Sequence, residues 1–280
     1  MNTLKTFFLL MVLTSFLLLV GYVIGGSGGI IVALILSLAM NFFAYWFSDK
    51  LALAMTKAHQ VTEQEDPELY ALVREQVSLA GLPMPKVYGI DTDSPNAFAT
   101  GRNPEHATVA VTRGIRELLT REELGAVLAH EMGHVGNRDT LIMTVVASIA
   151  GAISMVAMMA QWSAMFGGFG GNNRERGGGN IIGLLIIAIV MPIAATLVRL
   201  AISRAREYQA DATGAHTSGR PYALASALEK LEAGSRTQPM QVAEGVSHLF
   251  IVNPLSGRSF INLFSTHPPI AERVKRLRSM

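Results

Sequence analysis

His130, Glu131 and His134 form the pattern in this chain that is best suited to metal chemistry. In an α-helix, residues four apart lie on one face, so both imidazole rings can reach one ion at about 2.0–2.1 Å. Glu131 would project beside them, where its carboxylate can take a proton from water. The alternative is a pair of capping or surface histidines. The spacing favours a zinc site with Glu131 as general base.

A catalytic zinc usually has three protein ligands and one open position, so a third ligand is expected elsewhere in the chain. Glu207 and Asp211 are also four residues apart in a helical pattern. We assign the longer Glu207 as the third ligand, and Asp211 as the acceptor of the free N–H group of a ligand histidine. The alternative is that both carboxylates only neutralise Arg204 and Arg206 on a solvated helix.

Hydrolysis of a peptide bond also requires a donor that stabilises the negative oxygen of the transition state. His267 is the first candidate for this role, and Arg273 is the second. Residues 94–101 are typical of a turn that leads into an edge strand, and residues 96–99 could hold an extended substrate by backbone hydrogen bonds. An ordinary helix-start residue and a plain turn are the alternatives. The predicted substrate-binding residues are Asn96, Ala97, Phe98, Ala99 and Arg273.

The composition is that of a membrane protein. Only 16% of the 280 residues are charged, whereas a soluble domain usually has about 25%. Four apolar stretches, at residues 7–24, 30–46, 141–166 and 181–200, approach or exceed the roughly 20 residues that cross a bilayer. The chain has no cysteine, which excludes disulfides and thiol ligands. It also lacks a run of Lys and Arg dense enough to suggest nucleic-acid binding.

The loops predict the orientation of these spans. Residues 25–29 (GGSGG) form a short uncharged turn, while positive charges follow the second and fourth spans. The positive-inside rule therefore places both termini and the polar segments in the cytoplasm. The predicted organisation is two transmembrane helices (1–46), the first part of a catalytic domain (47–140), two transmembrane helices with a Gly-rich outer loop (141–200) and the second part of the domain (201–280).

The candidate site should lie just beyond the membrane. His134 precedes the third span by seven residues, and Glu207 follows the fourth span by seven. At a rise of about 1.5 Å per residue, both would be roughly 10 Å beyond the membrane end of their helices. Because the two spans must be antiparallel, we expect the histidines and the glutamate to meet at the same height.

The polar segments contain recognisable local signals. Residues 66–80 have the pattern of an amphipathic helix that ends at Gly81. Residues 86–90 and 108–112 are rich in β-formers and are predicted to be strands. Thr120 and Glu123 form a capping box, which predicts a helix that starts there and continues through His134. Two more helices are predicted, at residues 222–233 and 268–277.

Four motifs carry a resemblance to a known family. They are HEMGHVGNRD at residues 130–139, REYQAD at 206–211, NAFATG at 96–101 and STHPP at 265–269. Together they resemble the bacterial HtpX family of membrane zinc proteases, which are related to the CAAX prenyl endoproteases. The resemblance covers nearly the whole chain, including the four hydrophobic spans.

This resemblance implies an α-helical membrane protein with four hydrophobic spans and a mainly helical α+β, gluzincin-type zinc protease domain. It implies one zinc ion per chain, held by His130, His134 and Glu207. It further implies a multi-pass protein of the bacterial inner membrane, with its site facing the cytoplasm, that degrades misfolded or damaged membrane proteins alongside other quality-control proteases. The residues expected to support the ligands from behind are Asp211, Asn137 and Asp139.

Two alternative functions use the same residues. A processing peptidase for lipidated peptides shares the chemistry, but the four predicted spans disfavour it because that relative has more. A membrane protein that holds zinc without hydrolysis should carry ionisable residues within its spans. The four stretches carry almost none before Arg199, which argues against this second alternative.

Overall fold

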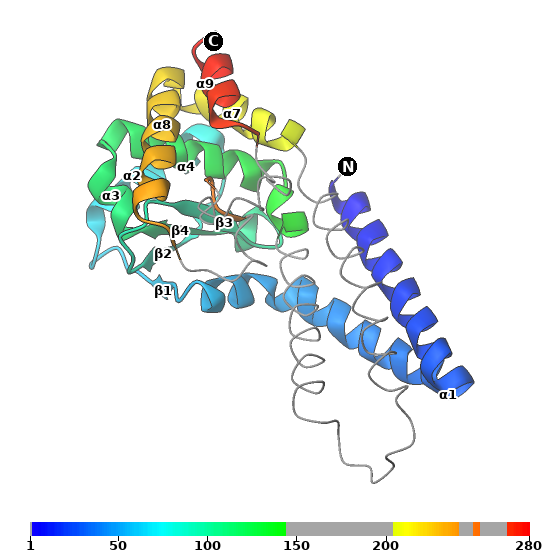
Figure 1. The fold of residues 1–280 in the computed structure, drawn as a ribbon. Helices are drawn as coiled ribbons and strands as arrows, with labels where there is room; N and C mark the ends of the chain where they lie inside the picture. The colour runs from blue at the N-terminus through cyan, green and yellow to red at the C-terminus, as the bar shows by residue number, and fades with distance from the viewer. Residues whose placement is uncertain (1, 144–203, 241–248, 253–267) are drawn as a thin grey trace.

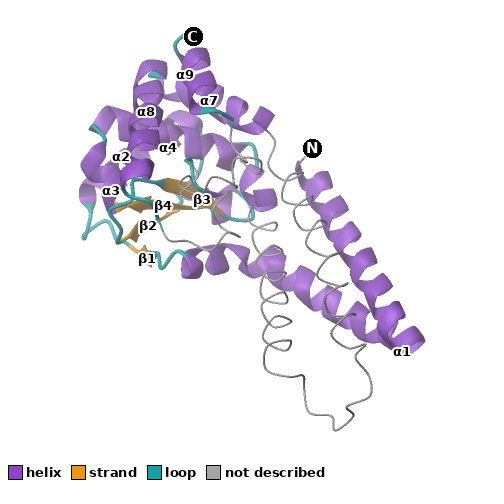
Figure 2. Cartoon of the chain, viewed as in Figure 1, coloured by secondary structure: helices purple, strands orange, loops and turns teal. Residues whose placement is uncertain are grey.

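The structure, a computed structural model, describes residues 2–143, 204–240, 249–252 and 268–280 (Figure 1). The predicted third and fourth spans lie outside these residues except for 141–143, and His267 lies outside them as well. The described part contains a domain of helices packed around a small sheet, from which one long helix, α1, projects (Figures 1 and 2).

α1 (Asn2–Met55) is assigned as one helix, but its path folds back on itself (Figure 1). The backbone of Gly26 has a φ of +57°, a conformation that glycine adopts easily because it has no Cβ. This position falls inside the uncharged glycine turn predicted at residues 25–29. The sequence predicted two helices separated by that turn, whereas the structure has one element with a sharp bend there.

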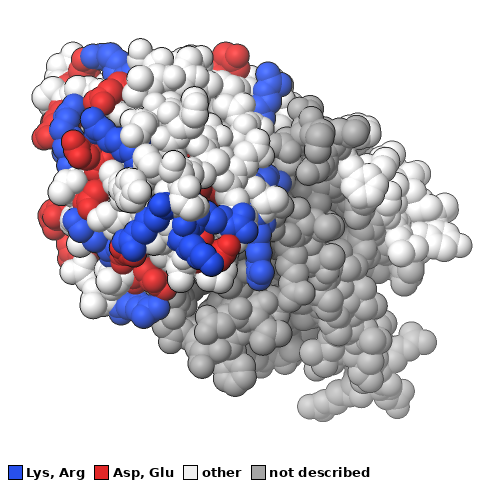
Figure 3. All heavy atoms as spheres, turned by 90° about the horizontal axis from the view of Figure 1, so that it is seen from above, with Lys and Arg blue, Asp and Glu red and all other residues white. Residues whose placement is uncertain are grey.

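The second arm of α1 has the character of a membrane span. Gly26–Phe47 comprises 22 residues with a mean hydropathy of 2.1, and it is the one stretch among the described residues long and apolar enough to cross a membrane. Large apolar side chains such as Phe7, Ile31 and Phe43 are exposed along both arms. In Figure 3 the charged side chains gather over the compact domain, and the projecting part of α1 shows none. The four-span arrangement stays a prediction.

The sheet contains four strands in the order β1-β2-β4-β3: β1 (His59–Gln60), β2 (Lys86–Ile90), β4 (Thr108–Thr112) and β3 (Ala97–Thr100). β2 and β4 are parallel, and β3 pairs antiparallel with β4. The strands predicted at 86–90 and 108–112 have these bounds. β3 is an edge strand, as the sequence predicted for the segment after residue 96.

Side chains alternate between the two faces of this sheet, as the period of two in a strand requires. One face packs against the helices through Val87, Val109 and Val111. The other face packs against the end of α1, where Ala52 and Leu53 contact a separate apolar cluster that includes Ile90, Phe98 and Ala110. The sheet therefore connects the helical domain to the base of α1.

Helix caps define the predicted helices of the first polar segment. α2 (Pro67–Ala80) begins after Asp66, whose carboxylate accepts a hydrogen bond from the Leu69 N–H, and ends at Gly81 in the left-handed conformation. α4 (Arg121–Gly136) has the predicted capping box: the Glu123 N–H donates to the Thr120 hydroxyl oxygen, and the Thr120 N–H donates to the Glu123 carboxylate. The short helices η1 (Pro104–His106) and α3 (Arg113–Leu118) flank β4.

The second polar segment supplies α7 (Arg204–Ser218), α8 (Pro221–Thr237) and α9 (Ile270–Leu277). α8 is longer than predicted, mainly at its C-terminal end, and α9 starts two residues later than predicted. These helices pack around α4, which is buried from residue 123 to 135 (Figure 1). Two segments distant in sequence thus contribute to one core.

Candidate active site

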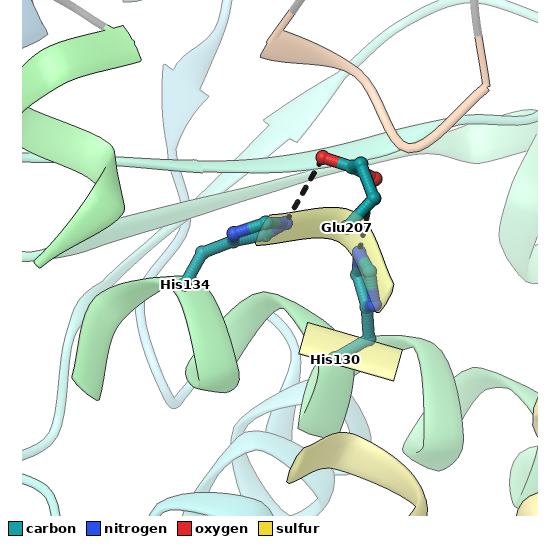
Figure 4. Close-up of side chains that lie close together, drawn as sticks. All are labelled: His130, His134 and Glu207. Carbon is teal, nitrogen blue, oxygen red and sulfur yellow. Dashed lines mark ion pairs between the residues drawn. The ribbon is translucent and has the colours of Figure 1, made fainter. Parts of the chain in front are cut away.

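His130 and His134 of α4 face Glu207 of α7 (Figure 4). The Nε2 atom of His134 is 3.5 Å from Oε1 of Glu207, and Nε2 of His130 is 4.0 Å from Oε2. One potential ligand atom from each residue lies within 4.8 Å of the others. A tetrahedral ion with bonds of about 2.0–2.1 Å separates its ligand atoms by about 3.4 Å. The three side chains therefore could hold a metal ion with only small adjustments.

The charge and the hydrogen bonding of the site also fit a divalent cation. The Nε2 atom of His130 is buried and has no hydrogen-bond partner among the described residues, which suits a nitrogen that binds a metal. Around the candidate ligands, the buried carboxyl groups outnumber the buried guanidinium groups by two when all are ionised (four minus two). These six residues are Glu131, Asp139, Glu207, Asp211, Arg206 and Arg273.

Two glycines let α4 and α7 approach closely enough to form the site. A Cβ atom on Gly214 of α7 would lie 2.7 Å from both the N and the Cα atom of His130, a separation that the backbone cannot accept. A Cβ atom added to Gly133 of α4 would lie 3.3 Å from the carbonyl oxygen of Ala210. The close contact between Gly214 and the backbone of His130 allows α7 to bring Glu207 within reach of the histidines.

Asp211 lies behind the first histidine. Its Oδ1 atom is 3.0 Å from Nδ1 of His130, whereas Nε2, the other ring nitrogen, faces Glu207. Arg273 of α9 binds the same carboxylate through two nitrogens, Nη2 to Oδ1 at 2.6 Å and Nε to Oδ2 at 2.8 Å. Burial alone would raise the pKa of Asp211, but the charge and hydrogen bonds of Arg273, together with His130, lower it to about 2.

Asp139 supports the second histidine in a similar way. Its Oδ2 atom is 3.2 Å from Nδ1 of His134, and its Oδ1 atom is 3.8 Å from Nε of Arg206. Burial alone would lower the pKa of His134, but the hydrogen bond with Asp139 and the negative charges of Glu207 and Glu131 raise it to about 9. By contrast, burial lowers the pKa of His130 by more than Asp211 raises it.

Glu131 occupies the position expected of a general base. Its side chain is buried, and its carboxylate accepts a hydrogen bond from the backbone N–H of Ala99 in β3. Burial raises the pKa of Glu131 to about 8, and the charge of Glu207 adds to this effect, while His134 and Ala99 oppose it. A cation at the ligands would favour the ionised form. Glu131 is therefore a buried carboxyl group whose protonation would respond to an ion at the neighbouring ligands.

The outer edge of β3 is partly occupied by another segment of the chain. The carbonyl oxygen of Ala97 accepts a hydrogen bond from the N–H of Ile251 at 3.1 Å. The Asn96 side chain binds the backbone of Val252 twice, through Nδ2 to the carbonyl oxygen at 2.8 Å and through Oδ1 to the N–H at 3.4 Å. The backbone-binding groups predicted to hold a substrate at Asn96 and Ala97 thus already have partners within the chain.

The remaining predicted substrate residues are placed differently from one another. Phe98 points to the face of the sheet away from α4, where its ring packs against Phe250 at 5.1 Å. Ala99 lies next to Glu131. Arg273 is fully buried, and all three of its guanidinium nitrogens have acceptors, the third being the Ile251 carbonyl oxygen at 3.2 Å. This burial favours a role for Arg273 behind the ligands instead of at the substrate.

Asn137, expected behind the ligands, is the C-cap of α4, and Nε2 of Gln209 lies 3.5 Å from its Oδ1 atom. Sequence reasoning missed three parts of the site: the position of Arg273 and Arg206 behind the two aspartates, the glycine contact at Gly214, and residues 249–252 beside β3. Only Gly214 left a sequence signal, as a glycine in a helical pattern seven residues after Glu207.

Comparison with known proteins agrees with this geometry. Residues 63–280 match peptidase family M48. A relative from Desulfatibacillum aliphaticivorans, named Protease HtpX homolog, is 55% identical over 99% of this chain and 89% of its own length. A relative of the same name from Syntrophobacter fumaroxidans is 53% identical over 99% and 98% of the two chains.

A solved structure, that of S. mikatae Ste24p, shares the fold. The likeness has a TM-score of 0.55 at 19% identity and covers 94% of this chain and 62% of that one. At this identity the likeness shows the fold alone. The family match and the near full-length relatives establish the family and the enzyme class: the chain belongs to peptidase family M48 and is a metalloprotease.

Proposed function

We propose that this protein is a zinc-dependent endopeptidase that hydrolyses peptide bonds in misfolded or damaged membrane proteins. The observation that carries the proposal is the buried arrangement of Glu131 beside a ligand set of His130, His134 and Glu207. A general base next to three converging ligands is the arrangement that metal-assisted peptide hydrolysis requires.

Zinc is the ion that this ligand set suits best. Two imidazole nitrogens and one carboxylate oxygen, from His130, His134 and Glu207, leave a fourth tetrahedral position open. We propose one ion per chain. When bound, it would supply a Lewis acid that polarises the scissile carbonyl group and lowers the pKa of water.

The protein's own groups handle the proton and the substrate. Glu131 takes a proton at its carboxylate from the attacking water and passes it to the leaving amine nitrogen. The N–H of Ala99, which now binds Glu131, lies on the outer edge of β3, where an extended substrate would pass. His267 is proposed to stabilise the negative oxygen of the substrate carbonyl, as its sequence context suggests.

We place the protein in the bacterial inner membrane, as a multi-pass protein with its active site on the cytoplasmic side. The apolar stretch Gly26–Phe47 and the exposed apolar side chains of α1 support membrane insertion. Ala52 and Leu53 of the same helix pack under the sheet, an arrangement that would hold the active site close to the membrane. The proposed partners are the lipid bilayer, unfolded polypeptides and other quality-control proteases.

A cleavage assay with full-length protein in detergent tests this function. We expect cleavage of casein and of an unfolded membrane protein, loss of cleavage with a chelator, and recovery when one equivalent of zinc is added. A prenylated peptide serves as the comparison substrate. Cleavage of the prenylated peptide alone would contradict the proposed substrate class, and cleavage that a chelator does not affect would contradict the metal chemistry.

A further inference from the structure

Arg273 is a fully buried arginine that reaches the active site from the last helix of the chain. We propose that it is a positioning residue, which holds Asp211, and through Asp211 the ring of His130, in the orientation that metal binding needs. The inference rests on the proposed zinc site. It gives α9 a part in building a site whose ligands come from α4 and α7.

The contacts of Arg273 are directed at Asp211 and not at open space. Two of its nitrogens bind the two oxygens of Asp211 at 2.6 and 2.8 Å, the paired geometry that fixes a carboxylate most strictly. The third binds the carbonyl oxygen of Ile251 at 3.2 Å. With its plane fixed, Asp211 presents Oδ1 to Nδ1 of His130 at 3.0 Å. The Nε2 atom of that ring is then aimed at the metal position.

Arg273 also acts on the third ligand. Its Nη1 atom lies 3.7 Å from Oε2 of Glu207, close enough to attract that carboxylate without a direct hydrogen bond. Glu207 and Asp211 are one turn apart on α7, so the positive charge of Arg273, which lies close to both carboxylates, opposes the repulsion between them. Without that charge, the two carboxylates would be driven apart and α7 would present Glu207 differently.

A second arginine on α9 provides a matched control. Arg276 lies with its guanidinium carbon 3.7 Å from the ring centre of Tyr208 on α7, and it binds Glu272 within its own helix. Arg276 therefore joins the same two helices as Arg273 but contacts no carboxylate of the site. A loss of general packing between α7 and α9 should appear in both variants, and a loss of ligand orientation should appear in only one.

The test compares Arg273→Lys, Arg273→Gln and Arg276→Gln in the full-length protein. Zinc affinity is measured by competition with a chromophoric chelator, and melting temperature is measured with and without zinc. We expect Arg273→Gln to weaken zinc binding by roughly 10–100-fold, Arg273→Lys to recover part of this loss, and Arg276→Gln to stay within about twofold of wild type. At saturating zinc, the kcat of Arg273→Lys should return toward wild type, because Arg273 does not contact substrate.

A double-mutant cycle with Asp211→Asn shows whether Arg273 acts through Asp211. Adding Arg273→Lys to Asp211→Asn should weaken zinc binding by less than about twofold further, because residues of one network are not additive. If the losses of zinc affinity caused by Arg273→Lys and by Asp211→Asn instead multiplied in the double variant, that result would overturn the inference. So would unchanged zinc affinity with kcat lost at saturating zinc, which would make Arg273 a substrate-contacting group. If wild type itself bound no zinc, the proposed function would fail instead, so the two failures are distinguishable.

Discussion

The Nδ1 atom of His130 lies 3.0 Å from Oδ1 of Asp211, although the two residues are 81 positions apart in the chain. Asp211 follows Glu207 by one helical turn, so α7 would supply both a proposed metal ligand and the carboxylate proposed to orient another ligand. Burial alone would raise the pKa of this carboxyl group, but the charge and hydrogen bonds of Arg273, together with His130, keep it ionised. The relationship ties metal binding to the packing of α7 against α4, and the first two predictions follow from it.

Replacing the two carboxylates of α7 should have unequal effects. Glu207→Ala removes a ligand and is expected to abolish stable zinc binding, whereas Asp211→Asn keeps all three ligands and should weaken it by roughly 10–100-fold. Chelator competition on the purified variants distinguishes these outcomes. The reverse order, with Asp211→Asn losing the metal and Glu207→Ala retaining it, would show that the ligand assignment is wrong.

Gly214→Ala should separate α7 from α4. The new methyl group would lie 2.7 Å from backbone atoms of His130, so the helix must shift, and both the melting temperature and the zinc affinity should fall. Gly136→Ala is the matched control, because its Cβ would meet only methyl groups of Leu82 at 3.8 Å. The control should be neutral or stabilised by up to about 1 kcal/mol, since alanine favours a helix. Equal zinc affinity in both variants would contradict a positioning role for Gly214.

Local signals in the sequence were sufficient for the elements that carry the site. The capping box at Thr120, the glycine after residue 80 and the β-rich runs predicted α2, α4, β2 and β4 closely, because caps and strand patterns act within a few residues. The three candidate ligands, which the structure brings together, were chosen from two pairs of residues, each four apart on a helix. Each of these inferences required only neighbours in sequence.

The interactions that sequence reasoning missed join distant segments. The sequence suggested Arg273 as a substrate-binding residue, and only the packing of α9 against α7 shows that it is buried against Asp211. The pairing of Ala97 with Ile251 likewise spans more than 150 residues without any local pattern. The predicted substrate role of Asn96 overlooked this segment, since an edge strand in sequence does not reveal what covers its edge.

Zinc binding should depend on pH through His134. Its pKa of about 9 in the metal-free protein means that a zinc ion must displace a proton, because only the neutral ring can be a ligand. The apparent affinity should therefore rise with pH, by up to roughly tenfold per unit, until about pH 9. Calorimetric titrations at pH 8 in buffers of different ionisation enthalpy measure the released protons.

Asp139→Asn is the control for this pH dependence. It removes the hydrogen bond that does most to raise the pKa of His134, so this variant should release fewer protons per zinc at pH 8 than wild type does. Its limiting affinity at high pH should also be lower, because the ring is less firmly oriented. Identical proton release in the two proteins would show that Asp139 does not set the protonation of His134.

The most direct measurement of the central claim combines zinc analysis with cleavage for Glu131→Gln. Glutamine keeps the shape of the side chain but cannot accept the proton, so we expect one zinc per chain and a cleavage rate reduced by about 10²–10⁴-fold. Glu122→Gln, an exposed change on the same helix, should retain both zinc and activity. A Glu131→Gln protein that binds zinc and cleaves casein at the wild-type rate would contradict the assignment of Glu131 as general base.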